Sequence, residues 1–243
     1  MHNHHLREAL STGPLVGTFL KLPRFEIVEL LKQAGYDFAV CDYEHAQMSP
    51  SDVCDVIRAG AAAGLPVTVR IPELNRGEIN RFLEAGAAGI QLARTRGDLG
   101  SGLADLVRYP PDGSRSVSLA QPAAEYGQIP LTDYLRSSND SVMAIGQFET
   151  ADYADGLDLA MKHLDVAFIG PVDLSVDLRT PGTLDSPPMT TAIQTIETAA
   201  HRAGTVLGTF AATTEAVNAT KQRGYRYIVY SSDLAMLAAG AGR

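Results

Sequence analysis

The chain has 243 residues, of which 45% are hydrophobic and 20% charged, so one large core is within reach and we expect a single domain over residues 1–243. The formal net charge of −8 argues against a nucleic-acid partner, because binding phosphate backbones requires a concentrated basic surface. No uncharged stretch approaches the roughly 20 apolar residues of a membrane-spanning helix, so we expect no membrane partner.

The N-terminal residues MHNHHLREALSTG carry no hydrophobic signal region. We expect residues 1–8 to form a flexible tail, and the three histidines among them to belong to a solvated end rather than to a metal site. Two cysteines, Cys41 and Cys54, are too few for a disulfide framework and are typical of a reducing compartment. We therefore expect a cytoplasmic protein.

A recurring pattern organises the rest of the chain: a helical segment, then a small residue with Gly, then an apolar run. It predicts a helix that ends in a left-handed Gly and is followed at once by a strand, as in βαβ units. The copies are KQAGYDFAV (32–40), AAAGLPVTV (61–69), EAGAAGIQL (84–92), HRAGTVLGTF (201–210) and KQRGYRYIV (221–229). Further strands are predicted at 14–19, 141–148 and 166–170.

Eight strands that alternate with helices predict an α/β protein with a (β/α)₈ TIM barrel, since a doubly wound open sheet more often has five or six strands. Residues 108–140 form a long irregular segment between the fourth and fifth strands, and we expect this segment to serve the active-site face. Residues 231–243 suffice for one short helix, which we expect to pack on a neighbouring subunit.

Barrel enzymes build their sites at the carboxyl ends of the strands. In this chain those ends carry polar groups that burial penalises unless they are paired or bind a ligand. They are Asp42, Glu44 and His45 after the second strand, Arg70 after the third, Gln147 and Glu149 after the fifth, and Asp173 after the sixth. We expect these side chains to converge on one mouth.

The residue types leave alternatives open. Glu149 and Asp173 are hard oxygen ligands that could hold one divalent cation, or they could cap two helix N-termini. Arg70 suits recognition of a carboxylate or enolate, or an ion pair with Asp42 or Glu44. His45, beside these acids, could transfer protons or simply be hydrogen-bonded in a packed loop.

Several enzyme classes are disfavoured on residue type. The sequence has no nucleophile elbow, no phosphate-binding loop of the G-x-x-x-x-G-K-[ST] type and no Rossmann glycine pattern. Its four lysines lie outside the predicted strands, Lys21 being the nearest to one, which disfavours a barrel aldolase with a strand-borne Schiff-base lysine.

Four short motifs occur in a fixed order: D-x-E-H (42–45), R-[VI]-P (70–72), Q-x-E-T (147–150) and G-P-x-D-L-S (170–175). This combination resembles the metal-dependent (class II) pyruvate aldolases of the HpcH/HpaI family, such as 4-hydroxy-2-oxoheptanedioate aldolase and 2-dehydro-3-deoxyglucarate aldolase, relatives of the citrate lyase β subunit. The resemblance runs from GTF (17–19) to SSDLAML (231–237).

The resemblance implies an enzyme that uses Mg²⁺, Mn²⁺ or Co²⁺ to join or cleave pyruvate, as a metal-bound enolate, and an aldehyde, giving 4-hydroxy-2-oxo acids. It also implies a hexamer, a dimer of trimers, with exchanged terminal helices. Glu149 and Asp173 of this chain resemble the metal ligands of the family. Arg70 resembles the residue that stabilises the enolate, and His45, oriented by Asp42, resembles the acid/base. The implied substrate-binding residues are Gln147, Phe19 and the backbone of Gly170, Pro171 and Val172.

Departures from the family pattern bear on specificity. Phe19 stands where many members have Trp, and Pro122 and Glu125 stand where arginines are expected on a loop that faces the substrate. The lost positive charge predicts an aldehyde without a terminal carboxylate. Three rivals remain: a biosynthetic enzyme that makes the enolate by decarboxylating oxaloacetate and uses a different acceptor, an acyl-CoA lyase, and a non-catalytic barrel that binds a keto acid.

Overall fold

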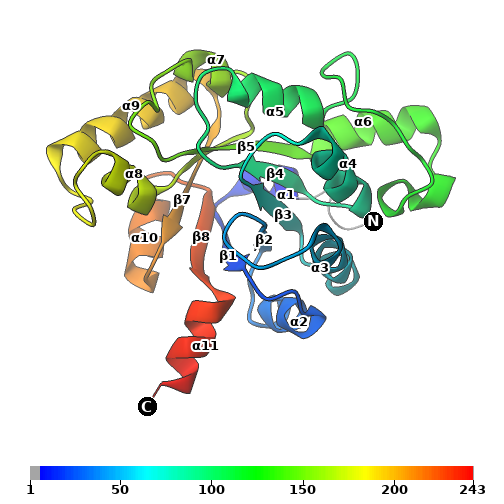
Figure 1. Cartoon of the computed structure of the whole chain (residues 1–243), viewed down its shortest axis with the longest axis horizontal. Coiled ribbons are helices and arrows are strands. Elements are labelled where there is room, and N and C mark those ends of the chain that lie inside the picture. The colour runs from blue at the N-terminus through cyan, green and yellow to red at the C-terminus, as the bar shows by residue number, and fades with distance from the viewer. Residues whose placement is uncertain (1–5, 243) are drawn as a thin grey trace.

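The computed structural model describes residues 6–242. Eight parallel strands hydrogen-bond in chain order and β8 pairs with β1, which closes a barrel (Figure 1). The strands are β1 (Leu15–Leu20), β2 (Phe38–Asp42), β3 (Val67–Ile71), β4 (Gly89–Leu92), β5 (Met143–Phe148), β6 (Val166–Ile169), β7 (Val206–Ala211) and β8 (Tyr227–Ser232). The predicted single-domain (β/α)₈ TIM barrel is confirmed.

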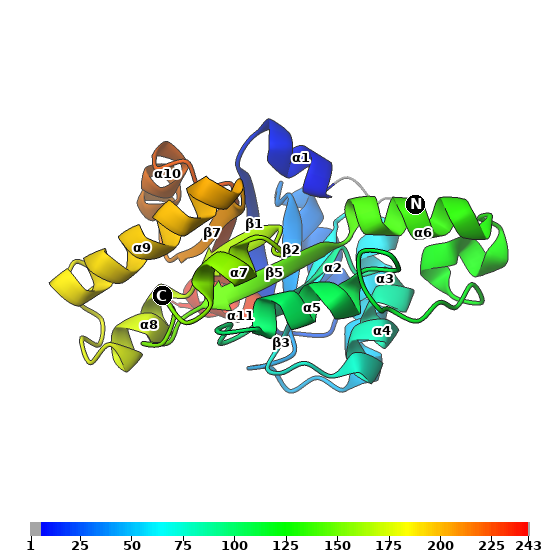
Figure 2. The same cartoon turned by 90° about the horizontal axis from the view of Figure 1, so that it is seen from above.

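Helices surround the strands when the molecule is seen from above (Figure 2). They are α1 (Leu6–Thr12), α2 (Phe25–Gln33), α3 (Pro50–Ala63), α4 (Arg76–Ala85), α5 (Leu99–Val107), α6 (Leu131–Ser141), α7 (Leu157–Met161), α8 (Pro171–Asp177), α9 (Pro187–Ala203), α10 (Thr214–Gln222) and α11 (Asp233–Ala241), with the short 3₁₀ segment η2 (Pro122–Gly127). Within residues 6–242, none of these helices is long and apolar enough to cross a membrane.

The predicted glycine turns are present at all five copies of the repeated pattern. Each glycine adopts a positive φ, a conformation that side chains with a Cβ rarely take. The values are 88° at Gly35, 70° at Gly64, 108° at Gly86, 74° at Gly204 and 87° at Gly224. Each turn sends the chain from the end of a helix into the next strand, so the local sequence encodes the αβ alternation.

Strand alternation decides which side chains enter the barrel. In β2, Phe38 and Val40 pack in the barrel interior, whereas Ala39 and Cys41 pack in the layer between barrel and helices. In β5, Ile145 has the interior position. Continuing the same two-residue period beyond the apolar positions leads to Asp42 on β2, to Gln147 on β5 and to Glu149 just past β5. The same alternation thus directs the apolar side chains into the barrel interior and the polar ones into the mouth.

The N-terminal segment departs from the expected flexible tail. Residues 6–8 belong to α1, in which Leu6 and Leu10 are each only 2% exposed and pack with the first interior residues of the strands (Figure 2). Arg7 adds an ion pair to Asp165 at 2.6 Å. The tail prediction is therefore wrong for residues 6–8, because two apolar side chains one helical turn apart cover the amino end of the barrel. Residues 1–5, with the three tail histidines, lie outside the described residues.

The segment at 108–140 also differs from the expectation. Helix α5 begins at Leu99, soon after β4, so the segment follows α5 and leads to β5 instead of joining β4 to a helix. Its last part is α6, and residues 114–116 contact the first turn of α4, where Arg76 donates to the carbonyl of Ser114 at 2.8 Å. The insertion therefore flanks α4 and belongs to a connection that leads into a strand, and a role of the whole segment at the active-site face stays a prediction.

Helix α11 confirms the predicted short terminal helix. It extends away from the barrel (Figure 1), and Asp233, at its start, is its one buried residue. Leu234 and Leu237 are 44% and 60% exposed. Met236 packs against the core, so α11 leaves one apolar face, that of Leu234 and Leu237, uncovered by the chain itself.

Candidate active site

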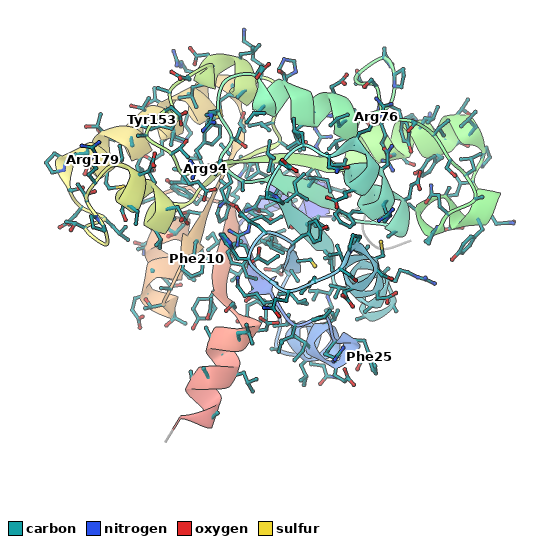
Figure 3. The ribbon with its side chains drawn as sticks, in the orientation of Figure 1. Phe25, Arg76, Arg94, Tyr153, Arg179 and Phe210 are labelled. Atoms are coloured by element: carbon teal, nitrogen blue, oxygen red, sulfur yellow. The ribbon has the colours of Figure 1, made fainter. Side chains whose placement is uncertain are left out.

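The polar strand ends meet at one cavity of about 380 Å³ at the carboxyl ends of the strands. Of the predicted residues, it is lined by Phe19, His45, Arg70, Gln147, Gly170, Pro171, Val172 and Asp173. In Figure 3, Arg94 and Phe210 lie over the strands, whereas Phe25 and Arg179 lie at the edge of the molecule. The ends of five strands that are far apart in sequence thus supply these residues to one mouth.

Asp42 and Arg70 stand opposite each other on β2 and β3 and form a buried ion pair. Arg70 donates to the two carboxylate oxygens through Nε at 2.9 Å and Nη2 at 2.7 Å. Burial alone raises the pKa of Asp42, but the hydrogen bonds and charge of Arg70, with a hydrogen bond from Lys21, lower it to about 2. The internal ion pair expected as one alternative for Arg70 is present, and it fixes the guanidinium.

His45 lies at the rim, with 57% of its side chain exposed. Asp42 Oδ1 accepts the backbone N–H of His45 at 3.1 Å, while the imidazole Nε2 lies 3.7 Å from Glu44 Oε2. Asp42 and His45 are thus hydrogen-bonded through the main chain, and the orienting of the imidazole by Asp42 stays a prediction.

Glu149 is buried at 3% exposure and held by two donors. The backbone N–H of Arg94 donates to Oε1 at 2.9 Å, and the Gln147 amide donates to Oε2. Gln147 is itself fixed by Gln91, whose amide donates to it at 2.5 Å. A Cβ at position 170, just past β6, would lie 2.7 Å from Glu149 Oε2 and 3.0 Å from its Cβ, so a side chain there would displace this carboxylate.

Three carboxylates influence one another at this end of the mouth. Burial raises the pKa of Glu149, and the charges of Glu44 and Asp173 raise it further against the lowering effect of Gln147 and Arg94. Burial likewise raises the pKa of Glu44, with Asp42 and Asp173 adding to the effect and Arg70 and His45 opposing it. Within residues 6–242, however, no group of three His, Cys, Asp or Glu side chains is close enough to hold a metal ion unaided.

Three contributors were missed from the sequence. Lys21, just past β1, reaches into the mouth and contacts Asp42. The sequence could have predicted this, because Lys21 follows Phe19 by two residues and strand alternation points both side chains into the barrel. Gln91 is a polar residue inside a strand and could also have been noticed. Arg94 acts through its backbone N–H, with φ at 50°, and no residue-type pattern announces such a contact.

Glu125 does not face this mouth. With Pro122 it lines a separate cavity of about 370 Å³ beside the end of α4, together with residues 85–88 at the amino end of β4. The prediction of an aldehyde without a terminal carboxylate depended on Glu125 facing the substrate. The fold of the single chain removes that support.

Comparison with known proteins identifies relatives along nearly the whole chain. Residues 15–239 match the model of the HpcH/HpaI aldolase/citrate lyase family. A hydroxypyruvate/pyruvate aldolase of Paraburkholderia phytofirmans is 32% identical, covering 92% of this chain and 88% of the relative. A 4-hydroxy-2-oxo-heptane-1,7-dioate aldolase of Salmonella dublin is 30% identical, covering 97% and 90%.

The solved structures agree. An HpcH/HpaI aldolase/citrate lyase family protein from Burkholderia cenocepacia superposes with a TM-score of 0.88 at 33% identity, over 98% of this chain and 96% of that one. The HpcH/HpaI aldolase of Desulfitobacterium hafniense gives 0.91 at 27% identity, over 97% and 93%. The curated relatives are named aldolases, which agrees with the prediction of a carbon–carbon lyase. The chain belongs to the HpcH/HpaI aldolase/citrate lyase family.

Proposed function

We propose that this protein is a divalent-metal-dependent aldolase that joins pyruvate to an aldehyde, or cleaves the resulting 4-hydroxy-2-oxo acid. The observation that carries the proposal is the gathering of Glu44, Glu149 and Asp173 beside a buried Arg70 and an exposed His45 at one barrel mouth. Relatives named as pyruvate aldolases support the same reaction class.

The residues present fit a hard divalent cation such as Mg²⁺, Mn²⁺ or Co²⁺. Their donors are carboxylate oxygens. Burial, and to a smaller extent mutual repulsion, raises the pKa of Glu149 and Glu44, and a cation would offset both effects. We assign Glu149 and Asp173 as the ligands, with water and substrate completing the shell. When bound, the cation would act as a Lewis acid on the ketone of pyruvate.

The chain's own groups then handle charge and protons. His45 takes a proton from the pyruvate methyl group, and the same imidazole returns a proton to the aldehyde oxygen when the carbon–carbon bond forms. Arg70, fixed by Asp42 through Nε and Nη2, keeps its Nη1 for the enolate oxygen. Gln147 holds Glu149 in place.

The remaining positions serve binding. The amides of Val172 and Asp173 lie in the first turn of α8, where backbone N–H groups have no intrahelical acceptor, so the segment from Gly170 through Pro171 suits the pyruvate carboxylate. Phe19 forms a wall, with the Arg70 guanidinium 4.4 Å from the ring centroid. The pocket therefore holds the donor between the carboxylate end and the aromatic wall.

The test is deuterium uptake into the pyruvate methyl group in D₂O, which requires no knowledge of the aldehyde. We expect uptake with Mg²⁺, Mn²⁺ or Co²⁺, none after EDTA, and a fall of about 100-fold or more in His45→Ala and Glu149→Gln. Matched controls are His201→Ala and Glu215→Gln, both exposed on outer helices, which should keep the wild-type rate. Uptake that ignores EDTA, or absence of uptake with every ion, would contradict the proposal.

The pH dependence of metal binding provides a second check on the same site. Glu149 and Glu44 must lose their protons to favour a cation, and their pKa values are raised above the ordinary 4.5. Protons therefore compete at higher pH than at ordinary glutamates. We expect Mn²⁺ affinity, measured by calorimetry, to fall as the pH drops from about 7 to about 5, and an affinity constant over this range would count against these ligands.

We further propose a homo-oligomer, a hexamer built as a dimer of trimers, in which α11 packs on a neighbouring copy. The support is the exposed apolar face of α11, with Leu234 and Leu237 uncovered by the chain's own elements. Asp233 anchors the start of the helix to the backbone N–H groups of Lys21 and Leu22 at 2.9 and 2.8 Å, so α11 leaves the barrel in a fixed direction.

A further inference from the structure

Lys21 is the one lysine in the cavity at the mouth, among residues 6–242. It follows Phe19 by two residues and so keeps the inward phase of β1. Its backbone N–H is held by Asp233, which is 6% exposed, and the next N–H, that of Leu22, by the same carboxylate oxygen. The backbone is thereby fixed, and the side chain enters the cavity from its β1–β8 side.

The charge of Lys21 is only partly neutralised. Its ammonium contacts Asp42, but this carboxylate already receives both donors of the Arg70 fork. Asp42 is thus shared between two cations, and Glu44, whose Oε2 lies 3.5 Å from Arg70 Nε, is the second anion of this group. An ammonium also has three N–H donors, and among residues 6–242 the Lys21 ammonium donates to Asp42, so donors remain for a ligand.

The strand beside Lys21 presents polar groups to the same cavity. The pairing of β1 with β8 shifts register between Gly17 and Phe19, and bulges of this kind re-aim side chains. Ser231 has φ at 58°, an uncommon conformation for a residue with a Cβ, and lines the cavity with Ser232. Ser232 already caps α11, accepting from the N–H of Ala235 at 3.2 Å, whereas Ser231 is turned toward the mouth.

The mouth is therefore polarised. Glu44, Glu149 and Asp173 make one end anionic, and the other end combines Lys21 and Ser231 with apolar walls from Phe19 and Phe210, whose ring centroids are 6.2 Å apart. A cavity of about 380 Å³ admits a short substrate. A single ammonium that is shared with Asp42, plus a hydroxyl, matches a monoanionic carboxylate better than a doubly charged phosphate.

We propose that Lys21, assisted by Ser231, is the specificity-determining residue for the acceptor and binds the terminal carboxylate of a short aldehyde whose carbons lie against Phe19 and Phe210. This inference rests on the proposed aldolase function. It reverses the expectation drawn from Glu125, because the cation that was thought to be missing from the substrate-facing surface is supplied by the end of β1.

The kinetic test compares a matched pair of acceptors, 4-oxobutanoate and butanal, with pyruvate in the Mg²⁺-loaded enzyme. We expect the ratio of kcat/KM for the acid to that for the neutral aldehyde to fall about 10-fold or more in Lys21→Met and to be largely kept in Lys21→Arg. Because the ratio cancels any general loss of activity, it separates carboxylate binding from support of Asp42. Lys162→Met, on the far side of the barrel, is the matched control and should leave the ratio unchanged.

A binding test needs no turnover. The ligand is 4-hydroxybutanoate, the unreactive alcohol of the acid acceptor, and NMR titration measures its affinity. We expect wild type and Lys162→Met to bind it about 10-fold more tightly than Lys21→Met does. The affinity for 1-butanol should be the same in all three proteins. Equal losses for acid and neutral ligands in Lys21→Met, or unchanged acid binding, overturn the Lys21 assignment. Absent deuterium uptake into pyruvate overturns the aldolase proposal instead, so the two failures are distinguishable.

Discussion

Asp42 is the residue on which most of the mouth depends. It is fully buried and accepts hydrogen bonds from the Arg70 side chain, the Lys21 side chain and the His45 backbone. A buried carboxylate with this many cationic donors costs little as long as all are present. Removing it would leave Arg70, at 6% exposure, without its two short hydrogen bonds and with only the more distant Glu44, 3.5 Å from its Nε, as an ionic partner.

We predict that Asp42→Ala lowers the free energy of unfolding by about 3–5 kcal/mol, the range for breaking a buried ion pair from one side. Urea denaturation followed by circular dichroism measures this loss. The matched control is Asp133→Ala, whose carboxylate pairs with Arg136 at the surface, 3.1 Å away, and whose loss should cost less than about 1 kcal/mol. Similar losses in the two variants would show that the Asp42 pair is not structural.

The same pair gives a pH dependence with a definite sign. The pKa of Asp42 is lowered from 3.8 to about 2, so the unfolded chain takes up the proton first as the pH falls. The stabilisation is complete above the unfolded pKa and is lost as the pH falls through the folded one. The stability difference between wild type and Asp42→Ala should accordingly shrink between pH values of about 4 and about 2, and a difference that grows in this window would contradict the assignment.

At the scale of elements, α1 contributes more than its seven residues suggest. A barrel of parallel strands leaves the apolar side chains at its amino end open to water unless another element covers them. Leu6 and Leu10 do this, in contact with the interior cluster that includes Met143 and Val166. The carboxyl end of the barrel can therefore hold a polar mouth while α1 keeps water from the core at the amino end.

We predict that Leu10→Ala destabilises the protein by about 2–5 kcal/mol, the usual cost of emptying a buried leucine site. Thermal unfolding and urea titration report the change. Leu159→Ala is the matched control, because Leu159 on α7 is 47% exposed and its truncation should cost far less. Equal stability of Leu10→Ala and wild type would restore the flexible-tail interpretation of this segment.

At the scale of the whole molecule, the unpartnered feature is α11. Met236 packs against the core, but Leu234 and Leu237 find no cover within the described chain, and exposed apolar surface of this kind marks interfaces. We predict that Leu237→Glu, which places a charge on that face, converts the proposed hexamer to smaller species in analytical ultracentrifugation. Leu159→Glu, a charge on an exposed leucine of α7, should leave the assembly intact. A wild-type monomer would contradict the oligomer outright.

The fold followed from local signals. Five left-handed glycines and the apolar runs after them predicted the αβ alternation, because backbone conformation at a glycine and strand burial are decided within a few residues. The tail was placed wrongly and the segment at 108–140 lies after α5, since these positions depend on what Leu10 covers and on which end of α5 the segment joins. These are facts of the assembled barrel.

The candidate site divides in the same way. The sequence by itself determined which groups stand at the strand ends, among them Asp42, Arg70 and Glu149, because the two-residue period of a strand carries into the residues just beyond it. Only the tertiary structure decided their partners: Arg70 rather than His45 takes the Asp42 carboxylate, and Lys21 rather than Glu125 faces the cavity. Closure of the barrel brings the strand ends together, and which groups then pair is set by register and distance across the mouth.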